Sequence, residues 1–184
     1  MLCAAPYLLH AQVSSAAAAS TPDVPDWALP SSATHKQYAP PPDFHRASRN
    51  FDTPIGIFQG QSDVGGALAP GSASYDAATQ QYTIISAGYN IWYTRDEFRF
   101  LWKKMSGDFS LAGDASFPIA QTPPHDRKVV LIVRQDLDDD SREIMTGEHG
   151  TGMVHLAERA EKNASTQPHR QHSSGKAIHN NRIG

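Results

Sequence analysis

Two aromatic residues followed by an arginine and an aspartate form the stretch of this sequence best suited to binding chemistry. Trp92, Tyr93, Arg95 and Asp96 lie between an asparagine and a strand-like run, near an expected strand end, where binding residues often occur. Flat aromatic rings pack against the apolar faces of sugar rings, but they also suit a protein core. We therefore predict a ligand-binding site at these four residues, with core packing as the alternative for the two aromatic ones.

The acidic side chains do not form a catalytic pattern. Glycoside hydrolysis generally needs two carboxyl groups about 5–10 Å apart across the scissile bond, and the available pairs are Asp96 with Glu97 and Glu143 with Glu148. Unpaired surface carboxylates are ordinary. A Gly-x-Ser-x-Gly elbow is missing, and the single cysteine, Cys3, lies far from the expected domain. The sequence predicts a non-enzymatic protein without a cofactor, and a degenerate hydrolase is the minor alternative.

An acidic turn follows the most apolar run of the sequence. It contains Asp136, Asp138, Asp139 and Asp140. Ca²⁺ takes about six to eight oxygen ligands, but the run lacks the glycine and the distal glutamate of an EF-hand loop. Aspartate favours turns because it hydrogen-bonds the backbone, so we predict a solvated turn and no metal. The histidines lack ligand spacing, and structural roles are expected for His125, His149 and His155.

The composition fits one domain with tails. The chain has 184 residues, and domains are commonly about 100–200 residues long. A net charge of -3 and a pI near 6.3 give no general attraction to phosphate backbones or anionic membranes. No uninterrupted apolar stretch reaches the roughly 18 residues of a membrane-spanning helix. We predict neither a nucleic-acid partner nor an integral membrane segment.

The two ends of the sequence differ from its middle. Residues 1–20 are mostly small and apolar, and the AAAAS run at 16–20 resembles the cleavage region of a secretory signal. No basic residue follows Met1, so a disordered leader is the alternative. The proline-rich segment 21–43 predicts an extended linker, and the polar segment 162–184 predicts a disordered tail. We expect an exported protein, periplasmic or extracellular, with its folded domain at 44–161.

Between the ends, period-two alternation predicts an all-β fold. Residues 81–87 read as a strand, and 96–105 place Phe98, Phe100 and Trp102 on one apolar face, so Trp102 is expected in the core. Residues 109–117 alternate after a turn and predict a hairpin with 96–105. Residues 128–136 are apolar on both faces, as in a central strand. The return strands are expected at Glu143–His149 and Met153–Arg159.

The order of short motifs carries a family resemblance. They are GSASYD at 71–76, YTI at 82–84, AGYNIW at 87–92, DEF at 96–98, GDFSL at 107–111, RK at 127–128 and RQDLD at 134–138. In this order the chain resembles the concanavalin A-like jelly-roll superfamily. Within it, the chain is similar to a bacterial domain of unknown function found in short secreted proteins catalogued as Tol-type biopolymer transporters. The resemblance covers about Phe44 to Lys162.

This resemblance implies an antiparallel two-sheet sandwich. The Glu-x-Asp-x-x-Glu signature of the catalytic glucanases of the superfamily is absent, which favours a non-catalytic module that binds a glycan or another envelope polymer weakly. The alternative is an interaction protein that docks a partner at an exposed sheet edge. Family members continue with further alternating runs beyond the position of Arg159, so the sandwich is expected to be incomplete at its C-terminus.

Overall fold

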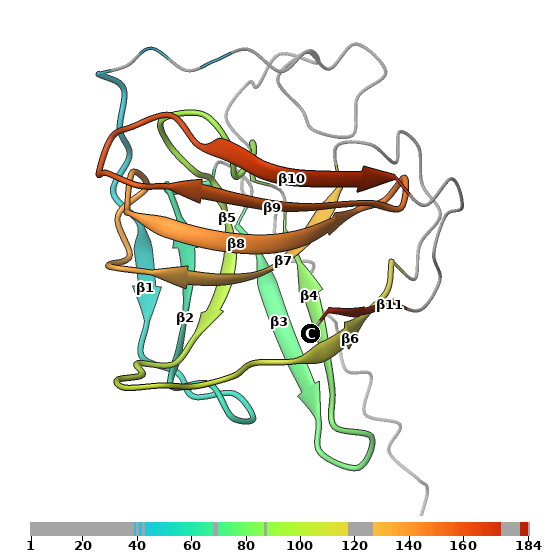
Figure 1. Ribbon diagram of the computed structural model, residues 1–184. Coiled ribbons are helices and arrows are strands. Elements are labelled where there is room, and N and C mark those ends of the chain that lie inside the picture. The colour runs from blue at the N-terminus through green and yellow to red at the C-terminus, as the bar shows by residue number, and fades with distance from the viewer. Residues whose placement is uncertain are drawn as a thin grey trace, which may run out of the picture.

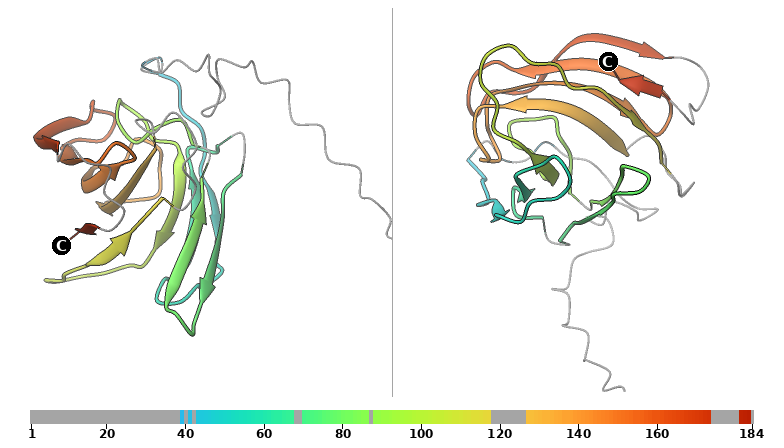
Figure 2. Two further views of the ribbon diagram at one scale, coloured as in Figure 1. Left: turned by 90° about the vertical axis from the view of Figure 1, so that its right-hand side faces the viewer. Right: turned by 90° about the horizontal axis from the view of Figure 1, so that it is seen from below.

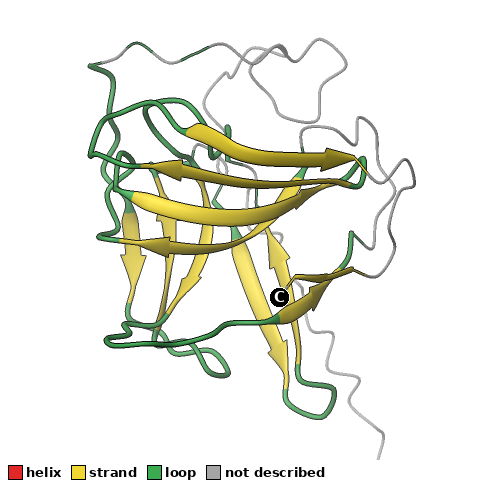
Figure 3. Ribbon diagram, viewed as in Figure 1, coloured by secondary structure: helices red, strands yellow, loops and turns green. Residues whose placement is uncertain are grey.

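The computed structural model describes residues 39, 41, 43–67, 70–86, 88–117, 127–173 and 181–183. The predicted leader and nearly all of the proline-rich linker lie outside these residues. The described chain is all-β, with eleven strands in antiparallel sheets and loops between them (Figure 3). It contains no helix of the length and apolarity needed to cross a membrane. The strands form two layers, seen from three directions in Figures 1 and 2.

One layer is a four-stranded antiparallel sheet in the order β10-β9-β8-β7 (Figure 1). Its strands are β7 (Lys128–Arg134), β8 (Glu143–His149), β9 (Met153–Arg159) and β10 (Gln167–Ser173). Because side chains alternate along a strand and pair across strands, the register builds rows on the inner face. These rows are Arg134, Glu143 and Arg159; Ile132, Met145 and Ala157; and Val130, Gly147 and His155.

The other layer contains a three-stranded antiparallel sheet in the order β1-β2-β5. Its strands are β1 (Arg49–Phe51), β2 (Gly60–Val64) and β5 (Phe98–Trp102). Val64 lies opposite Phe98 in this sheet, and both side chains belong to a buried cluster with Met145 and Ala157 of the four-stranded sheet. The hydrophobic core therefore lies between the two layers.

Two further strand pairs complete the described fold. The hairpin of β3 (Ser72–Asp76) and β4 (Gln81–Ile85) lies beside β5 in the second layer (Figure 1). The Arg99 backbone N–H donates to Ser86 Oγ at 3.0 Å, which joins this hairpin to β5. The second pair is β6 (Gly113–Ala115) with β11 (Asn181–Ile183).

The structure confirms strands within six of the predicted runs and corrects two predicted arrangements. Strands lie at β4, β5, β6 (Gly113–Ala115), β7, β8 and β9 as expected. The predicted hairpin of 96–105 with 109–117 is wrong, because β5 pairs with β2 and β6 pairs with β11. The predicted central strand at 128–136 is also wrong in its position: among the described residues β7 pairs only with β8, at the edge of its sheet. Val133 on its outer face is 48% exposed, so an apolar pattern on both faces did not mean cover on both faces.

The expected disordered tail does not hold for the segment just after Arg159, where β10 pairs with β9. The sequence of β10 is polar and contains Pro168, next to which the register shifts. Proline and bulges are typical of edge strands, because an edge strand leaves one row of backbone groups unpaired. Such a strand needs no alternating apolar residues, which explains why periodicity did not reveal it.

A glycine in β2 makes room for the Trp102 ring, and this packing is testable. A Cβ at Gly60 would lie 2.3 Å from Trp102 Cζ2, so Gly60→Ala must displace the ring and strain its Nε1 hydrogen bond to Ser62 Oγ, 2.9 Å long. We expect a loss of about 1–3 kcal/mol of unfolding free energy in urea denaturation. Gly113→Ala is the matched control, because a Cβ at Gly113 meets nothing within 4 Å. Equal stability of the two variants would contradict this packing.

Candidate functional site

The charged row of the four-stranded sheet meets a loop of the other layer at Asp96. Arg134 ends β7, Glu143 begins β8 and Arg159 ends β9, and the register places the three side by side. Asp96 lies just before β5 and forms an isolated bridge with Ile91. The loop therefore presents a carboxylate to a row that carries two guanidinium groups.

These four residues form a buried ionic network. Arg159 binds Asp96 in a bidentate manner, with distances of 2.7 Å from Nη2 to Oδ1 and 2.8 Å from Nη1 to Oδ2. Arg134 Nη1 lies 2.6 Å from Asp96 Oδ2 and also contacts Glu143. All four side chains are at most 1% exposed. Bidentate, charge-assisted bonds of this kind are among the strongest hydrogen bonds in proteins.

Arg159 also connects segments that are far apart in the sequence. Its Nη2 donates to the backbone carbonyls of Trp92 and Tyr93, at 3.3 and 3.2 Å. Its Nη1 donates to the carbonyl of Ser141 at 3.0 Å, and its Nε donates to that of Ala164 at 3.0 Å. One side chain thus holds the loop before β5, the turn before β8 and the segment before β10.

The network changes the proton affinity of one of its carboxyl groups. Burial raises the pKa of Glu143 to about 8, and the negative charge of Asp96 adds to this effect while Arg134 and Arg159 oppose it. Two carboxylates held together in a low dielectric favour retention of one proton. Both groups are sealed from solvent, so the arrangement can hold a proton but offers no open face to a substrate.

The structure separates the four residues predicted to bind a ligand. Asp96 is 0% exposed and Arg95 is 6% exposed. Trp92 packs against the core, and its ring makes an edge contact with His155 at 5.9 Å. Tyr93 is half-buried. Trp92 and Asp96 therefore take part in interior contacts, while Arg95 and Tyr93 belong to a separate group of side chains.

That group, which we name the aromatic cluster, consists of Arg95, of Phe44 and Tyr89 beside its guanidinium, and of Tyr93 next to Tyr89. The Arg95 guanidinium lies 4.9 Å from the centroid of the Phe44 ring and 5.8 Å from that of Tyr89. The Tyr89 and Tyr93 rings are 6.4 Å apart. Both Nη atoms of Arg95 donate to Glu97 Oε2 at 3.3 Å. Phe44 is 40% exposed, so the cluster has a buried cation at its base and an aromatic ring at the surface.

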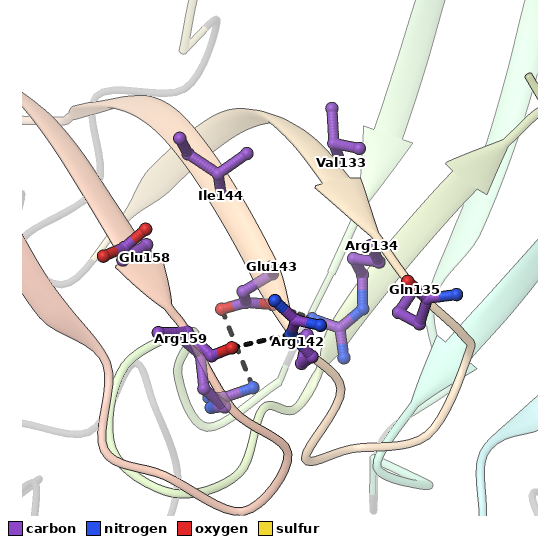
Figure 4. Close-up of a pocket in the computed structure, with 9 residues that line it drawn as sticks. Val133, Arg134, Gln135, Arg142, Glu143, Ile144, Glu158 and Arg159 are labelled. Carbon is purple, nitrogen blue, oxygen red and sulfur yellow. Dashed lines mark hydrogen bonds and ion pairs between the residues drawn. The ribbon is translucent and has the colours of Figure 1, made fainter. Parts of the chain in front are cut away.

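A shallow hollow of about 340 Å³ lies at the end of the four-stranded sheet (Figure 4). Val133 and Ile144 pair across β7 and β8 and are 48% and 45% exposed there. Gln135, Arg142 and Glu158 also line the hollow. So do the network residues Arg134, Glu143 and Arg159 (Figure 4), whose side chains are at most 1% exposed. The hollow has a mixed apolar and polar lining but no aromatic ring.

The acidic turn is confirmed as a turn, but it is not fully solvated. Asp139 and Asp140 are 3% and 8% exposed. Asp139 accepts from the Arg46 backbone N–H at 2.9 Å and lies 2.9 Å from His45 Nδ1. The Nζ of Lys162 lies within ion-pair distance of Asp136, Asp138 and Asp140. Among the described residues, no group of three His, Cys, Asp or Glu side chains is placed to hold a metal.

Sequence reasoning missed the two arginines of the buried network and the proximity of two histidines. His149 and His155 lie on adjacent strands with ring centroids 5.0 Å apart, although their spacing suggested no site. The available signal was register: once the turns between the strands are fixed, Arg134, Glu143 and Arg159 must pair, and His149 and His155 must share a face.

Comparison with known proteins adds no relative: the chain matches no protein-family model, no curated protein and no solved structure.

Removing Arg159 tests the importance of the buried network. Arg159→Met leaves Asp96 with less compensation in the interior, so we expect a loss of about 3–5 kcal/mol of unfolding free energy. Chemical denaturation followed by far-UV circular dichroism measures it. Arg142→Met is the matched control, because Arg142 is exposed and its Nε bonds one backbone carbonyl, that of Ala160. The loss in Arg142→Met should stay below about 1 kcal/mol. A similar loss in both variants would show that the buried network contributes no more to stability than an exposed arginine.

The raised pKa of Glu143 predicts a stability loss as the pH rises from about 5 to 8. The folded state binds this proton more tightly than the unfolded state, so the stabilisation is complete below the ordinary pKa of 4.5 and is lost as the pH rises through about 8. Glu143→Gln mimics the protonated form and should remove this slope between about pH 5 and 8. Urea denaturation at each pH measures it, with Glu161→Gln as the control because Glu161 is exposed. An unchanged slope in Glu143→Gln would refute the assignment.

Proposed function

We propose that this chain is a non-catalytic, exported β-sandwich module of the concanavalin A-like jelly-roll type that binds a glycan or another envelope polymer at the aromatic cluster. The observation that carries the proposal is the placement of the Phe44 and Tyr89 rings beside the Arg95 guanidinium, with the Tyr93 ring next to that of Tyr89. The export part rests on the composition of residues 1–20 and on the sequence resemblance.

The two layers of antiparallel strands support the sandwich part of the proposal. Buried side chains from β2 and β5 pack against Met145 and Ala157 of the facing sheet, as the inner faces of a sandwich do. The order of motifs along the sequence favours the jelly-roll type.

The placement of the carboxylates supports a non-catalytic role. Asp96 and Glu143 are sealed in the ionic network, and Glu97 is 6% exposed and paired with Arg95. Glu148 is 3% exposed. A glycosidase needs an acid and a base that reach opposite sides of the scissile bond, and these four groups lie beneath the surface instead.

The chemistry of the aromatic cluster favours a sugar ligand. Aromatic rings offer large, rigid contact area, and tyrosine adds a hydroxyl that can hydrogen-bond. Arg95 is held in place by Glu97, and Arg46 lies 3.7 Å from the same carboxylate and 5.2 Å from the Phe44 ring. The rings are therefore positioned before a ligand arrives, which lowers the entropy cost of binding.

Ring removal tests the proposed site. Phe44→Ala and Tyr93→Ala should each weaken binding to a polysaccharide by about 3- to 10-fold, because a ring contact contributes about 0.5–1.5 kcal/mol beyond its buried area. The measurement is affinity electrophoresis or pull-down on a panel of bacterial and plant polysaccharides. Phe109→Ala is the matched control: Phe109 is 45% exposed, close to the 40% of Phe44, but lies on the loop between β5 and β6. Absence of binding across the panel, or an equal loss in all three variants, would overturn the proposal.

The second candidate is docking of another subunit on the four-stranded sheet. Val133, Ile144 and Leu156 are 48%, 45% and 36% exposed on its outer face, and β7 has one neighbour among the described strands. An exposed edge can pair with a strand of another chain. Size-exclusion chromatography separates the candidates, because a stable oligomer without polysaccharide affinity favours docking and a monomer with affinity favours glycan binding.

A further inference from the structure

A buried histidine towards the other end of the inner face has no hydrogen-bond partner in the described part of the chain. His155 is 2% exposed, and neither its Nδ1 nor its Nε2 is bonded to any described residue. It lies in the row with Val130 and Gly147, and a Cβ at Gly147 would come within 3.1 Å of its Cε1. A buried polar side chain without partners is rare and costly in native proteins, so this position calls for an explanation.

The charged neighbours of His155 are cationic or can become so. Lys128 of β7 and His149 of β8 are the charged groups that act on it. On β10 the residue in register is Gln171, and Glu148 of β8 pairs instead with Val154, the neighbour of His155 on β9. In the loop before β5, the contact is the uncharged Trp92 ring. An imidazolium at this position would meet the repulsion of Lys128, and burial and these charges outweigh the attraction that a tryptophan ring offers a cation, since together they lower the pKa of His155.

Trp92 is the residue of the loop before β5 that His155 contacts. Its ring lies 5.9 Å from the His155 ring and 5.3 Å from Lys128 Nζ, and this Nζ donates to the Ile91 carbonyl at 3.0 Å. Trp92 directly precedes Tyr93 and lies in the same loop as Arg95. A displacement of Trp92 would thus move the segment that carries part of the aromatic cluster.

We propose that His155 is an acid-sensitive contact between the layers: its protonation displaces Trp92 and loosens the loop before β5, which releases a ligand held at the aromatic cluster. The displacement of Trp92 stands on the geometry around His155, whereas the release of a ligand rests on the proposed function.

The direction of the pH effect follows from the environment of the ring. Burial, and then the charges of Lys128 and His149, lower the pKa of His155 from its ordinary value of 6.5 to about 4. The stability of the closed contact is complete above pH 6.5 and is lost as the pH falls towards 4. Protonation of Glu143 stabilises the fold as the pH falls, which opposes the effect of His155 over part of this range. The variants of His155 must therefore be compared with wild type at each pH.

Fluorine NMR of the full chain labelled with 5-fluorotryptophan tests the displacement. Resonances of the three tryptophans are assigned with single Trp→Phe variants, and the pH is lowered from 7.5 to 3.5. We expect the Trp92 resonance to shift with a midpoint between about pH 4 and 6.5, while the Trp102 resonance stays in place and reports that the fold persists. In His155→Gln, which cannot take up this proton, the shift should disappear.

Two further variants sharpen the result. His149→Gln removes one repulsive neighbour and should move the Trp92 midpoint to higher pH, which keeps the proposal testable if His155→Gln does not fold. His169→Gln is the control. His169 is exposed, and its Nε2 lies 2.9 Å from Oε1 of Glu158, a residue on the outer face of β9, whereas His155 lies on the inner face. A Trp92 resonance that is constant down to pH 4, or a midpoint unaffected by both His155→Gln and His149→Gln, would overturn the proposal.

The ligand part is measured separately. Polysaccharide binding in the wild type should weaken about fourfold between pH 7 and 3.5, because about three quarters of His155 is then protonated, and it should persist in His155→Gln. If no polysaccharide binds at pH 7, the proposed function fails, and the fluorine titration still decides whether His155 controls Trp92. If binding occurs and is equal at both pH values, the release is refuted while the binding site stands.

Discussion

The buried contact between Asp96 and Arg159 is the interaction on which the arrangement of this protein depends. It joins a loop of one layer to the last residue of β9 in the other, and Arg159 also binds carbonyls from the turn before β8 and the segment before β10. Removing two charges from water costs several kcal/mol each, so the contact is tolerable only because Arg134 and Glu143 complete it. Each strand end in the charged row is thereby fixed by the others, and a change in one partner affects the whole end of the sheet.

This constraint divides the space between the layers into regions of different chemistry. The charged row lies at one end, the apolar row with Met145 and Ala157 lies in the middle, and the row with His155 lies towards the other end. The loop before β5 touches two of these regions, through Asp96 in the charged row and through Trp92 at His155. Residues between these two anchors, including Tyr93 and Arg95, are therefore positioned by contacts made inside the protein. This is the physical reason why a binding site on this loop would be rigid at neutral pH and sensitive to acid.

Much of the secondary structure could be predicted from the sequence, and less of the pairing. The strands β4 to β9 followed from alternation, apolar runs and turn residues, which are local properties. The partner of β5 did not, because two neighbouring alternating runs suggest a hairpin whether or not the chain forms one. The edge position of β7 was hidden by its apolar outer face, and β10 was hidden by its polar sequence. For the candidate site, the sequence pointed to the right loop, but it gave no means of telling that Asp96 faces an arginine pair while Arg95 lies among aromatic rings.

The sequence by itself determined that the chain forms β-strands, where most of them lie and that the loop at 88–96 concentrates aromatic and charged residues, because alternation and turn chemistry act over a few residues. Only the tertiary structure decided which strands are neighbours and which buried charges meet. Arg159 and Asp96 are 63 residues apart, and the register of β7, β8 and β9 aligns their row. Long-range contacts of this kind form only when the entropy cost of closing the chain is balanced by all of them together, so no single segment encodes them.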